Sequence, residues 1–523
     1  MQKIYIYDST LRDGMQAEGI SFSLEDKLKI VEQLDAMGVD YIEAGNPGSN
    51  PKDLDLFNVL QEKGLGHARL VAFGSTRRAN IDAEGDRNLA AMLAAGTSTI
   101  AIFGKSWDFH VIEVLHTTLD ENLRMIADSV AYMKQHGKEV IFDAEHFFDG
   151  YKRNPEYAIK TLEAAVNAGA DCLALCDTNG GAFPMEIYDI TRCVVERFDI
   201  PVGIHCHNDG GMAVANTVMG VQAGAIQVQG TLNGYGERCG NADLFPIIAN
   251  LQLKMGYRCI PDEKMAELTT ISRYISEIAN LPPDTKAPYV GASAFTHKAG
   301  MHIDAVLKAP TSFEHIDPAL VGNSRRLLMS EMSGRSTVLT RMKRFDQSLT
   351  KDSPEVQAVI DELKRLEYEG YQFEGAEASF DLLIMKQLGR YKKLFDIKDF
   401  KVIADQPWQS EDNSAAAMIK VLVDGTEEMT AAEGDGPVDA LDKALRKALE
   451  VFYPQLKKMH LTDYKVRVLD SRAATAAKVR VLIESSDGQY SWSTVGVSTN
   501  IIAASWIAMV DAIEYTLLKG DDI

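Results

Sequence analysis

Short apolar runs alternate with amphipathic runs between residues 3 and 255 of this chain. The apolar runs are rich in β-branched and aromatic residues, which predicts strands. The amphipathic runs, such as SLEDKLKIVEQLDAMG at 23–38, repeat apolar residues at three- and four-residue steps and predict helices, here ending at Gly38. The predicted strands are KIYIYD (3–8), YIEAG (41–45), ARLVAFG (68–74), TIAIFGK (99–105), VIFDAEHF (140–147), CLALCDT (172–178), VGIHCHN (202–208) and IQVQG (226–230).

This order of strands and helices predicts a closed (β/α)8 barrel. Strands that read as continuous apolar runs are buried on both faces, as in a parallel sheet covered by helices. Eight strand–helix units in about 250 residues match a TIM barrel better than an open doubly wound sheet. A dinucleotide-binding fold would also need a GxGxxG turn directly after a strand, and none is placed there.

The second half of the chain is organised differently. Residues 256–385 lose the alternation, and LPPDTKAPYVG at 281–291 is typical of a linker. From residue 386 a twofold repeat begins, because IKVLVDG at 419–425 is echoed by VRVLIES at 479–485, each followed by a polar segment and a helical pattern. We expect a barrel at 1–278, linker and helical lid subdomains at 279–385, and an α+β regulatory domain at 386–523. On pattern alone, the repeat suits ligand sensing and dimerisation equally.

Composition narrows the class of protein. With 523 residues, 46% hydrophobic and 25% charged, the chain is typical of a soluble protein of two to four domains. The net charge of −21 argues against a nucleic-acid partner. The sequence MQKIYIYDST has no signal-peptide pattern, and no apolar run approaches the roughly 18 residues of a membrane span. The six cysteines include no CxxC pair, which is typical of reduced thiols in the cytoplasm.

Four dispersed polar residues predict a metal site. Asp13 follows the first predicted strand, His205 and His207 end the seventh, and Asn241 follows the eighth. Strands seven, eight and one are neighbours in a closed barrel, so these side chains are expected to meet at the mouth. Residues two apart on a strand share a face, which turns both imidazoles inward and Cys206 outward. The oxygen and nitrogen donors suit Mn, Mg, Co or Zn; the alternative is a hydrogen-bonded polar mouth without metal.

Further charged residues at strand ends are candidate active-site groups. Arg12 requires an anion or a polarised carbonyl if it is buried, and the alternative is an ion pair with Asp8 or Glu43. Glu43 and Glu145 are catalytic candidates or partners of Arg12 and of a ligating histidine. Thr178 is either a hydroxyl donor to a substrate carboxylate or a turn former beside glycines.

Two histidines lie in the predicted lid. His297 and His302 occur in FTHKAGMHIDA, at 295–305. A histidine on a closing lid is suited to general base catalysis near neutral pH. The alternative for each is an ordinary surface histidine.

These segments together resemble the acetyl-CoA-dependent 2-oxoacid synthases, which include isopropylmalate, homocitrate and citramalate synthases. The resemblance covers essentially the whole chain, and the segments at 19–53, 73–78, 103–111 and 142–158 are most similar to the long citramalate synthases. One departure is Ser9, where threonine is usual, with no expected consequence. The matching motifs are DSTLRDG (8–14), HCHNDGGMAVAN (205–216), NGYGERCGNADL (233–244) and FTHKAGMHIDAVLK (295–308).

The resemblance implies a role for each candidate. The chain would condense acetyl-CoA with pyruvate to (R)-citramalate and CoA, the first step of a threonine-independent route to isoleucine. His302, which follows the AGM turn, is implied in preference to His297. The implied sets are a divalent metal on Asp13, His205, His207 and Asn241, oxoacid binding by Arg12, Glu43 and Thr178, and catalysis by Arg12, Glu145 and His302.

The same resemblance implies regulation and leaves the activity open in part. The C-terminal repeat is expected to bind isoleucine between two protomers, with TAAEGDGP (430–437) and SWSTVGVSTN (491–500) as candidate glycine-rich loops or, alternatively, ordinary hairpin loops. A homodimer is expected. The nearest alternative activity is a 2-isopropylmalate synthase acting on 2-oxoisovalerate, since a pocket discriminates a few methylenes by only about 1–3 kcal/mol. The sequence is also compatible with a lyase running the reverse cleavage and with a non-catalytic amino-acid sensor on a retired barrel.

Overall fold

The computed structural model describes residues 1–523 apart from 329–334, 406–413, 470–476, 489 and 523. The described chain divides into two compact units. Unit 1 comprises Met1–Phe295 and Ile316–Ser324, and unit 2 comprises Thr296–His315 and Arg325–Ile523. The domain boundaries expected from the sequence stay a prediction.

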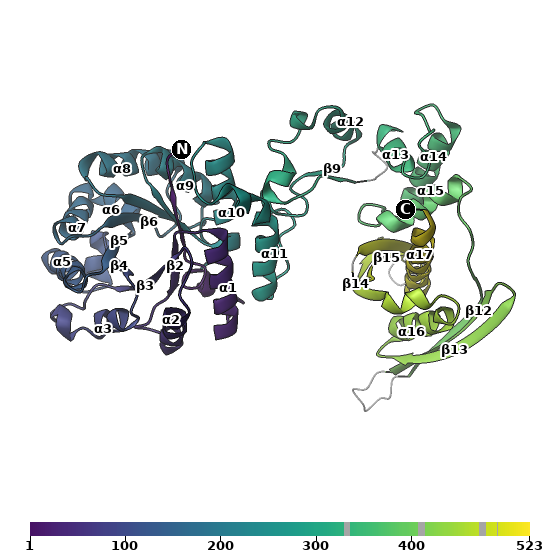
Figure 1. The fold of residues 1–523 in the computed structure, drawn as a ribbon, viewed down its shortest axis with the longest axis horizontal. Coiled ribbons are helices and arrows are strands. Elements are labelled where there is room, and N and C mark those ends of the chain that lie inside the picture. Colours follow the sequence, from purple (N-terminus) through teal and green to yellow (C-terminus); the bar gives the residue numbers. More distant parts are fainter. Residues whose placement is uncertain (329–334, 406–413, 470–476, 489, 523) are drawn as a thin grey trace. The chain divides into compact units, whose positions relative to one another are not determined.

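Unit 1 is a closed barrel of eight parallel strands in chain order, as predicted (Figure 1). The barrel closes where β1 pairs with β8. Three predicted strands extend too far, because the observed strands end at Glu145, Asp177 and Cys206 and the chain then turns into loops at the barrel mouth. The strands are β1 (Tyr5–Asp8), β2 (Tyr41–Gly45), β3 (Arg69–Ser75), β4 (Thr99–Lys105), β5 (Glu139–Glu145), β6 (Cys172–Asp177), β7 (Val202–Cys206) and β8 (Gln227–Gly230).

Helices surround the barrel, and α1 shows how its ends are set by a capping residue and a glycine. Helix α1 starts at a capping box in which the Ser23 hydroxyl accepts from the Asp26 amide, worth about 1 kcal/mol. It ends at Gly38 with φ of 85°, and a Cβ there would lie 2.6 Å from Pro261 Cδ, so only glycine fits. The helices of unit 1 are α1 (Leu24–Met37), α2 (Pro51–Lys63), α3 (Arg87–Ala94), α4 (Asp108–Glu113), α5 (Leu119–Gln135), α6 (Phe147–Arg153), α7 (Pro155–Asn167), α8 (Pro184–Arg197), α9 (Ala213–Gln222), α10 (Leu244–Ala249) and α11 (Leu268–Ile278).

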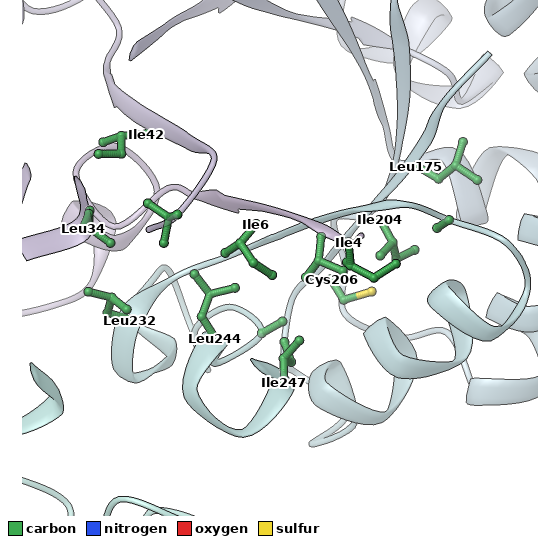
Figure 2. Packing of buried hydrophobic residues seen from close by; sticks show 14 of the residues in the cluster. Ile4, Ile6, Leu34, Ile42, Leu175, Ile204, Cys206, Leu232, Leu244 and Ile247 are labelled. Carbon is green, nitrogen blue, oxygen red and sulfur yellow. The ribbon is translucent and has the colours of Figure 1, made fainter. Parts of the chain in front are cut away.

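The barrel wall separates two apolar layers. The larger layer lies between strands and helices, where Ile204 and Cys206 of β7 pack with α10 residues such as Ile247 (Figure 2). Cys206 therefore points outward, as predicted. The smaller layer fills the barrel interior and includes Tyr7, Phe73 and other residues, with Phe103 packed against it. Burial of these apolar side chains is the main stabilising term of the barrel, and the mouth end of its inner face carries polar side chains.

Unit 2 begins with the segment that the sequence predicted as a lid, followed by small helices. Strand β9 (Thr296–His297) pairs with β10 (Arg326–Leu327), and helix α12 (Gly300–Lys308) follows β9. The charged segment SPEVQAVIDELKRLEYEG at 353–370 forms α14. The remaining helices of this part are α13 (Arg335–Met342), α14 (Pro354–Glu369) and α15 (Glu377–Gln387).

The predicted twofold repeat is present, since each half consists of a three-stranded antiparallel sheet followed by a helix. The prediction that the segments at 430–437 and 491–500 form exposed loops is wrong for most of their residues. Residues 430–434 belong to β13 and residues 491–498 to β16, because their amide groups are used in ladders with β12 and β15. The elements are β11 (Asp396–Asp405), β12 (Ser414–Val423), β13 (Thr426–Gly434), α16 (Pro437–Glu450), β14 (His460–Val468), β15 (Val479–Ser486), β16 (Ser491–Ser498) and α17 (Ile501–Asp522).

One helix among the described residues passes a length and hydropathy test for a membrane span. It is the segment Ile501–Lys519 of α17, with a mean hydropathy of 1.6. Within unit 2, 56% of that window is buried, and α17 packs on β15 and β16. Because the core helix of a soluble domain passes the same test, this is weak support for a span.

Candidate functional site

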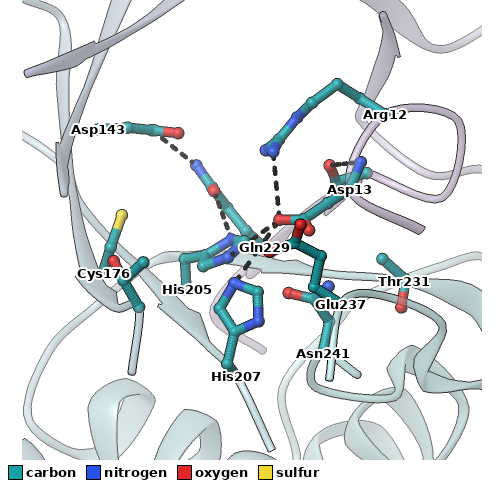
Figure 3. A network of polar contacts seen from close by, with 12 residues as sticks. Arg12, Asp13, Asp143, Cys176, His205, His207, Gln229, Thr231, Glu237 and Asn241 are labelled. Carbon is teal, nitrogen blue, oxygen red and sulfur yellow. Dashed lines mark hydrogen bonds and ion pairs between the residues drawn. The ribbon is translucent and has the colours of Figure 1, made fainter. Parts of the chain in front are cut away.

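Three predicted metal ligands meet at the mouth of the barrel. Asp13, His205 and His207 each offer a ligand atom, and these atoms lie within 4.8 Å of one another. Asp13 Oδ2 is 3.5 Å from His205 Nε2 and 3.8 Å from His207 Nε2 (Figure 3). All three side chains are buried. Buried nitrogen and carboxylate donors converging on one point are the donor set that divalent metals prefer.

Barrel topology explains how distant residues converge. Asp13 lies in the turn after β1, His205 in β7, and β8 lies between these two strands. His207 follows the end of β7 and forms an isolated antiparallel bridge with Asn241. The bridge brings the fourth predicted ligand to the same edge of the barrel.

Asn241 has a buried acceptor that fits a metal. Its Nδ2 donates to the Tyr235 carbonyl at 3.1 Å, while its Oδ1 is buried and has no hydrogen-bond partner among the described residues. An unmet buried acceptor is unfavourable unless a cation or water completes it. Gly236 has φ of 153°, and a Cβ there would lie 2.1 Å from Asn241 Nδ2, so the loop needs glycine at this position.

A relay of hydrogen bonds orients His205. Its Nδ1 lies 3.1 Å from Gln229 Oε1, and Gln229 Nε2 donates to Asp143 Oδ1 at 3.2 Å. Because an amide oxygen only accepts, Nδ1 carries the proton, and the lone pair of Nε2, on the side facing Asp13, is left to bind a cation. Burial lowers the pKa of both imidazoles, that of His207 to about 4, so both are neutral ligands near pH 7.

Arg12 is held between two carboxylates. Its Nε donates to Glu43 Oε2 at 2.6 Å, and its Nη1 lies 3.2 Å from Asp13 Oδ2. The guanidinium also lies 3.8 Å from the centre of the Phe73 ring, a cation–π distance. Burial raises the pKa of Asp13, but the Arg12 charge and then His205 outweigh it and hold that pKa at about 2. Asp13 is therefore ionised throughout the physiological range.

The ion pair between Arg12 and Glu43, which the sequence also allowed, is present. Glu43 is fully buried and also accepts hydrogen bonds from Tyr7 Oη at 2.6 Å and from the Ser9 hydroxyl. Glu43 lies behind Arg12 rather than in the pocket lining, and its predicted contact with substrate stays a prediction. Arg12, which Glu43 holds through Nε, itself lines the cavity.

A cavity of about 470 Å³ lies at the barrel mouth, and its lining includes Arg12 and the three clustered ligand candidates Asp13, His205 and His207. Glu145 forms an ion pair with Lys105, and Thr178 Oγ1 accepts from the His146 amide at 2.9 Å. Phe73 and Phe103 stack with centroids 5.2 Å apart. A polar end beside an apolar wall suits a small, anionic, partly apolar ligand. Lining residues are Leu11, Arg12, Asp13, Met15, Gln16, Lys27, Asn46, Ser49, Asn50, Asp53, Phe73, Phe103, Asp143, Glu145, Cys176, Thr178, His205, His207, Glu237 and Arg238.

His302 belongs to unit 2, where it lies on α12. Its assignment to the same catalytic site as Arg12 and Glu145 stays a prediction. His297 is buried in unit 2 with Glu314 as its partner. The alternative of an ordinary surface histidine is therefore wrong for His297, because its ring is enclosed and bonded.

Sequence reasoning missed Asp143 and Gln229. Asp143 lines the cavity, and burial, followed by the charge of Glu43, raises its pKa to about 7. A signal was present in both strands, since Asp143 and Glu145 alternate in β5 and Gln227 and Gln229 alternate in β8. Polar residues two apart in an otherwise apolar strand share the inner face.

Models of three known families match successive parts of the chain. Residues 3–275 match the family described as HMGL-like, and residues 289–370 match the homocitrate synthase post-HMGL domain-like family. Residues 374–517 match the LeuA allosteric (dimerisation) domain. Together these matches extend over most of both units.

Full-length relatives agree with this order of domains. The chain is 53% identical over 522 residues to the (R)-citramalate synthase of Aquifex aeolicus, covering 100% of this chain and 99% of that protein. It is 50% identical over 523 residues to the (R)-citramalate synthase of Geobacter sulfurreducens, with 100% and 99% covered. A probable 2-isopropylmalate synthase of Methanopyrus kandleri is 30% identical over 511 residues, with 97% of each chain covered. The resemblance predicted from the motifs is confirmed.

One similar solved structure is the HMG-CoA lyase of Bacillus subtilis. It covers 54% of this chain and 96% of that chain, with 23% sequence identity and a TM-score of 0.46.

Proposed function

We propose that this chain, which belongs to the (R)-citramalate synthase family, condenses acetyl-CoA with pyruvate and hydrolyses the thioester to give (R)-citramalate and CoA. The observation that carries the proposal is the buried cluster of Asp13, His205 and His207 beside Arg12, at the polar end of a small cavity. The donors fit a divalent ion, and Mn, Mg, Co and Zn are all compatible with them. When bound, the ion acts as a Lewis acid toward the C2 carbonyl of the oxoacid.

The protein groups would orient the oxoacid as follows. Arg12 donates to the C2 carbonyl oxygen and stabilises the negative charge that develops there, with Glu43 preventing its rotation. The Thr178 hydroxyl accepts from the His146 amide, so its own proton is directed elsewhere and can bind the substrate carboxylate. The Arg12 interaction strengthens as charge moves to the C2 oxygen, which is the condition for catalysis, whereas the Thr178 interaction orients the oxoacid.

Proton transfer from acetyl-CoA is assigned to His302 and Glu145. In this proposal His302 removes a proton from the methyl group of the thioester, and the carbanion attacks C2 of pyruvate. Glu145, paired with Lys105 at the cavity wall, assists the deprotonation. Water then cleaves the thioester and CoA leaves, which makes the overall reaction irreversible.

The test is release of the CoA thiol from acetyl-CoA by the purified chain, with pyruvate and with 2-oxoisovalerate, each with and without chelator. We expect release with pyruvate that chelation removes and added metal restores. Preference for 2-oxoisovalerate would change the assignment to a 2-isopropylmalate synthase. No release with either substrate would contradict the synthase assignment and favour the lyase or the non-catalytic amino-acid sensor. Adding isoleucine and leucine to the same assay extends the test to regulation.

We propose in addition that isoleucine binds the C-terminal repeat and inhibits the enzyme, which is a homodimer. The match of residues 374–517 to an allosteric dimerisation domain supports this proposal. We expect inhibition by isoleucine at concentrations where leucine has no effect, and a dimeric mass in solution. A monomeric mass at micromolar concentration would contradict the homodimer.

The aromatic wall predicts which residue limits substrate size. Replacing Phe103 with alanine removes half of the stacked pair in the cavity wall. We expect the ratio of kcat/KM for 2-oxoisovalerate to that for pyruvate to rise about 10-fold, because two extra methyl groups then fit. Phe109→Ala is the control, since Phe109 is 38% exposed and outside the cavity lining. An unchanged ratio in Phe103→Ala would show that another part of the cavity sets substrate size.

A further inference from the structure

The chain passes between the two units at three points. These points are Phe295–Thr296, His315–Ile316 and Ser324–Arg325. The segment between the first two points, residues 296–315, belongs to unit 2. The contacts next to these three points therefore decide how firmly the intervening segment, which contains α12 and His302, is held.

Glu314 joins the three connections through its side chain. Its Oε1 lies 3.2 Å from His297 Nε2, and Arg325 donates from Nε to Oε1 and from Nη2 to Oε2, both at 2.6 Å. His297 follows the first connection, Glu314 precedes the second, and Arg325 follows the third. We call His297, Glu314 and Arg325 the hinge clamp. Strand pairing of β9 with β10 joins the first and third connections as well.

The hinge clamp is built as a charged unit. Glu314 and His297 are buried, with 6% and 8% of their surfaces exposed. Hydrogen bonding to Arg325 lowers the pKa of Glu314 despite its burial, so the carboxylate is ionised where it meets the guanidinium. A bidentate pair between Arg and carboxylate fixes orientation as well as distance. Breaking such a buried pair on one side leaves an uncompensated charge.

Phe313, the neighbour of Glu314, carries this constraint to His302. The rings of His302 and Phe313 stack, with centroids 4.1 Å apart and planes at 24°. Helix α12 has nine residues, of which only Ile303 and Val306 are buried. Few apolar residues therefore anchor α12, and the stack with Phe313 is a direct contact that orients the exposed His302 imidazole.

We propose that Glu314 is a positioning residue, which through the hinge clamp and Phe313 sets the location of the His302 imidazole for proton removal. The inference rests on the proposed function, in which His302 is the base. The clamp residues all belong to unit 2 and are not among the residues that line the cavity. Its loss changes the rate of the proton-transfer step and leaves oxoacid binding by Arg12 intact.

The experiment is single-turnover kinetics on the full-length, metal-loaded enzyme. Glu314→Gln removes the charge at nearly constant shape, and Phe313→Leu removes the ring while leaving the clamp in place. We expect the single-turnover rate constant to fall about 10- to 100-fold in Glu314→Gln, since small displacements of a catalytic group have effects of this order. In Phe313→Leu we expect a fall of about 2- to 10-fold, as for loss of one aromatic pair. Pyruvate affinity stays at the wild-type value in both.

The controls separate positioning from a loss of folded protein. A variant that only reduces the folded fraction lowers the amplitude of the single turnover and leaves its rate constant unchanged. Glu374→Gln is the matched control, because it breaks the ion pair with Lys298, the neighbour of His297, without touching the clamp. We expect its rate constant to equal that of the wild type. Phe313→Leu keeps the test possible if Glu314→Gln does not fold.

His302→Gln distinguishes failure of this inference from failure of the proposed function. Slow turnover in His302→Gln with wild-type rate constants in Glu314→Gln and Phe313→Leu would overturn the positioning role alone. An unchanged rate constant in His302→Gln would overturn the assignment of His302 as the base, and the positioning role with it. Slow turnover in all three variants, with normal Glu374→Gln, supports the inference.

Discussion

Asp13→Asn is expected to lose its bound metal and to reduce kcat by at least about 1000-fold, since it removes the only carboxylate of the cluster and the Lewis acid with it. The substitution keeps the size of the side chain, so the cavity changes little. Metal content of the purified variant and the rate of CoA release are the measurements. In the wild type a chelator is expected to lower Tm, because metal binds only the folded state.

Two comparisons make this prediction specific. In Asp13→Asn the chelator is expected to leave Tm unchanged, since no site remains to be emptied. Asp120→Asn, at an exposed position at the start of α5, is the control and should retain metal and activity. Retention of stoichiometric metal in Asp13→Asn would contradict the assignment of the cluster as the metal site.

Arg12→Lys is expected to reduce kcat/KM for pyruvate by about 100- to 1000-fold, with metal content unchanged. Lysine keeps the positive charge but lacks the planar set of donors that binds Glu43 through Nε and leaves Nη1 directed toward Asp13. A positive charge at this position is therefore insufficient for oxoacid binding and catalysis without the planar donor set. Steady-state kinetics with varied pyruvate, together with metal analysis, measure the effect.

The control for Arg12→Lys is Arg124→Lys on α5. Arg124 is exposed and pairs with Glu121, a buried carboxylate that keeps Arg77 as a second partner, so the exposed Arg124 contributes little. Its kinetics should match those of the wild type. A wild-type kcat/KM in Arg12→Lys would show that Arg12 acts only as a structural partner of Glu43, the role that an ion pair alone would give it.

Much of the fold follows from local pattern. Short apolar runs separated by amphipathic ones indicated all eight strands, and Ser23 and Gly38 marked the ends of α1. The errors in strand length occurred at strand ends, where the alternation of apolar residues does not show where a strand stops. The predicted strand through residue 147 ends at Glu145, because His146 takes a left-handed conformation with φ of 56° that starts α6. Nothing in the apolar pattern distinguishes that turn from one more strand residue.

The C-terminal repeat shows a different kind of error. Glycine near residues 434 and 496 suggested exposed turns, yet both glycines lie in strands. A Cβ at Gly496 would lie 2.0 Å from the carbonyl oxygen of Ala504, so this glycine permits close approach of α17 to β16. The sequence shows where a glycine is, but only the packed structure shows whether the glycine forms a turn or allows two elements to approach closely.

The sequence by itself determined the barrel and the repeat, and it predicted which polar side chains meet at the mouth. Position along a strand decides which face a side chain occupies, and barrel closure brings strands one, seven and eight together. Only the tertiary structure decided which partners each side chain has: Glu43 with Arg12, Gln229 between His205 and Asp143, and Glu314 with the two ends of its own segment. Such contacts join residues from 11 to 86 positions apart, and their geometry depends on strand register and helix packing summed over the whole unit. No local pattern contains that information.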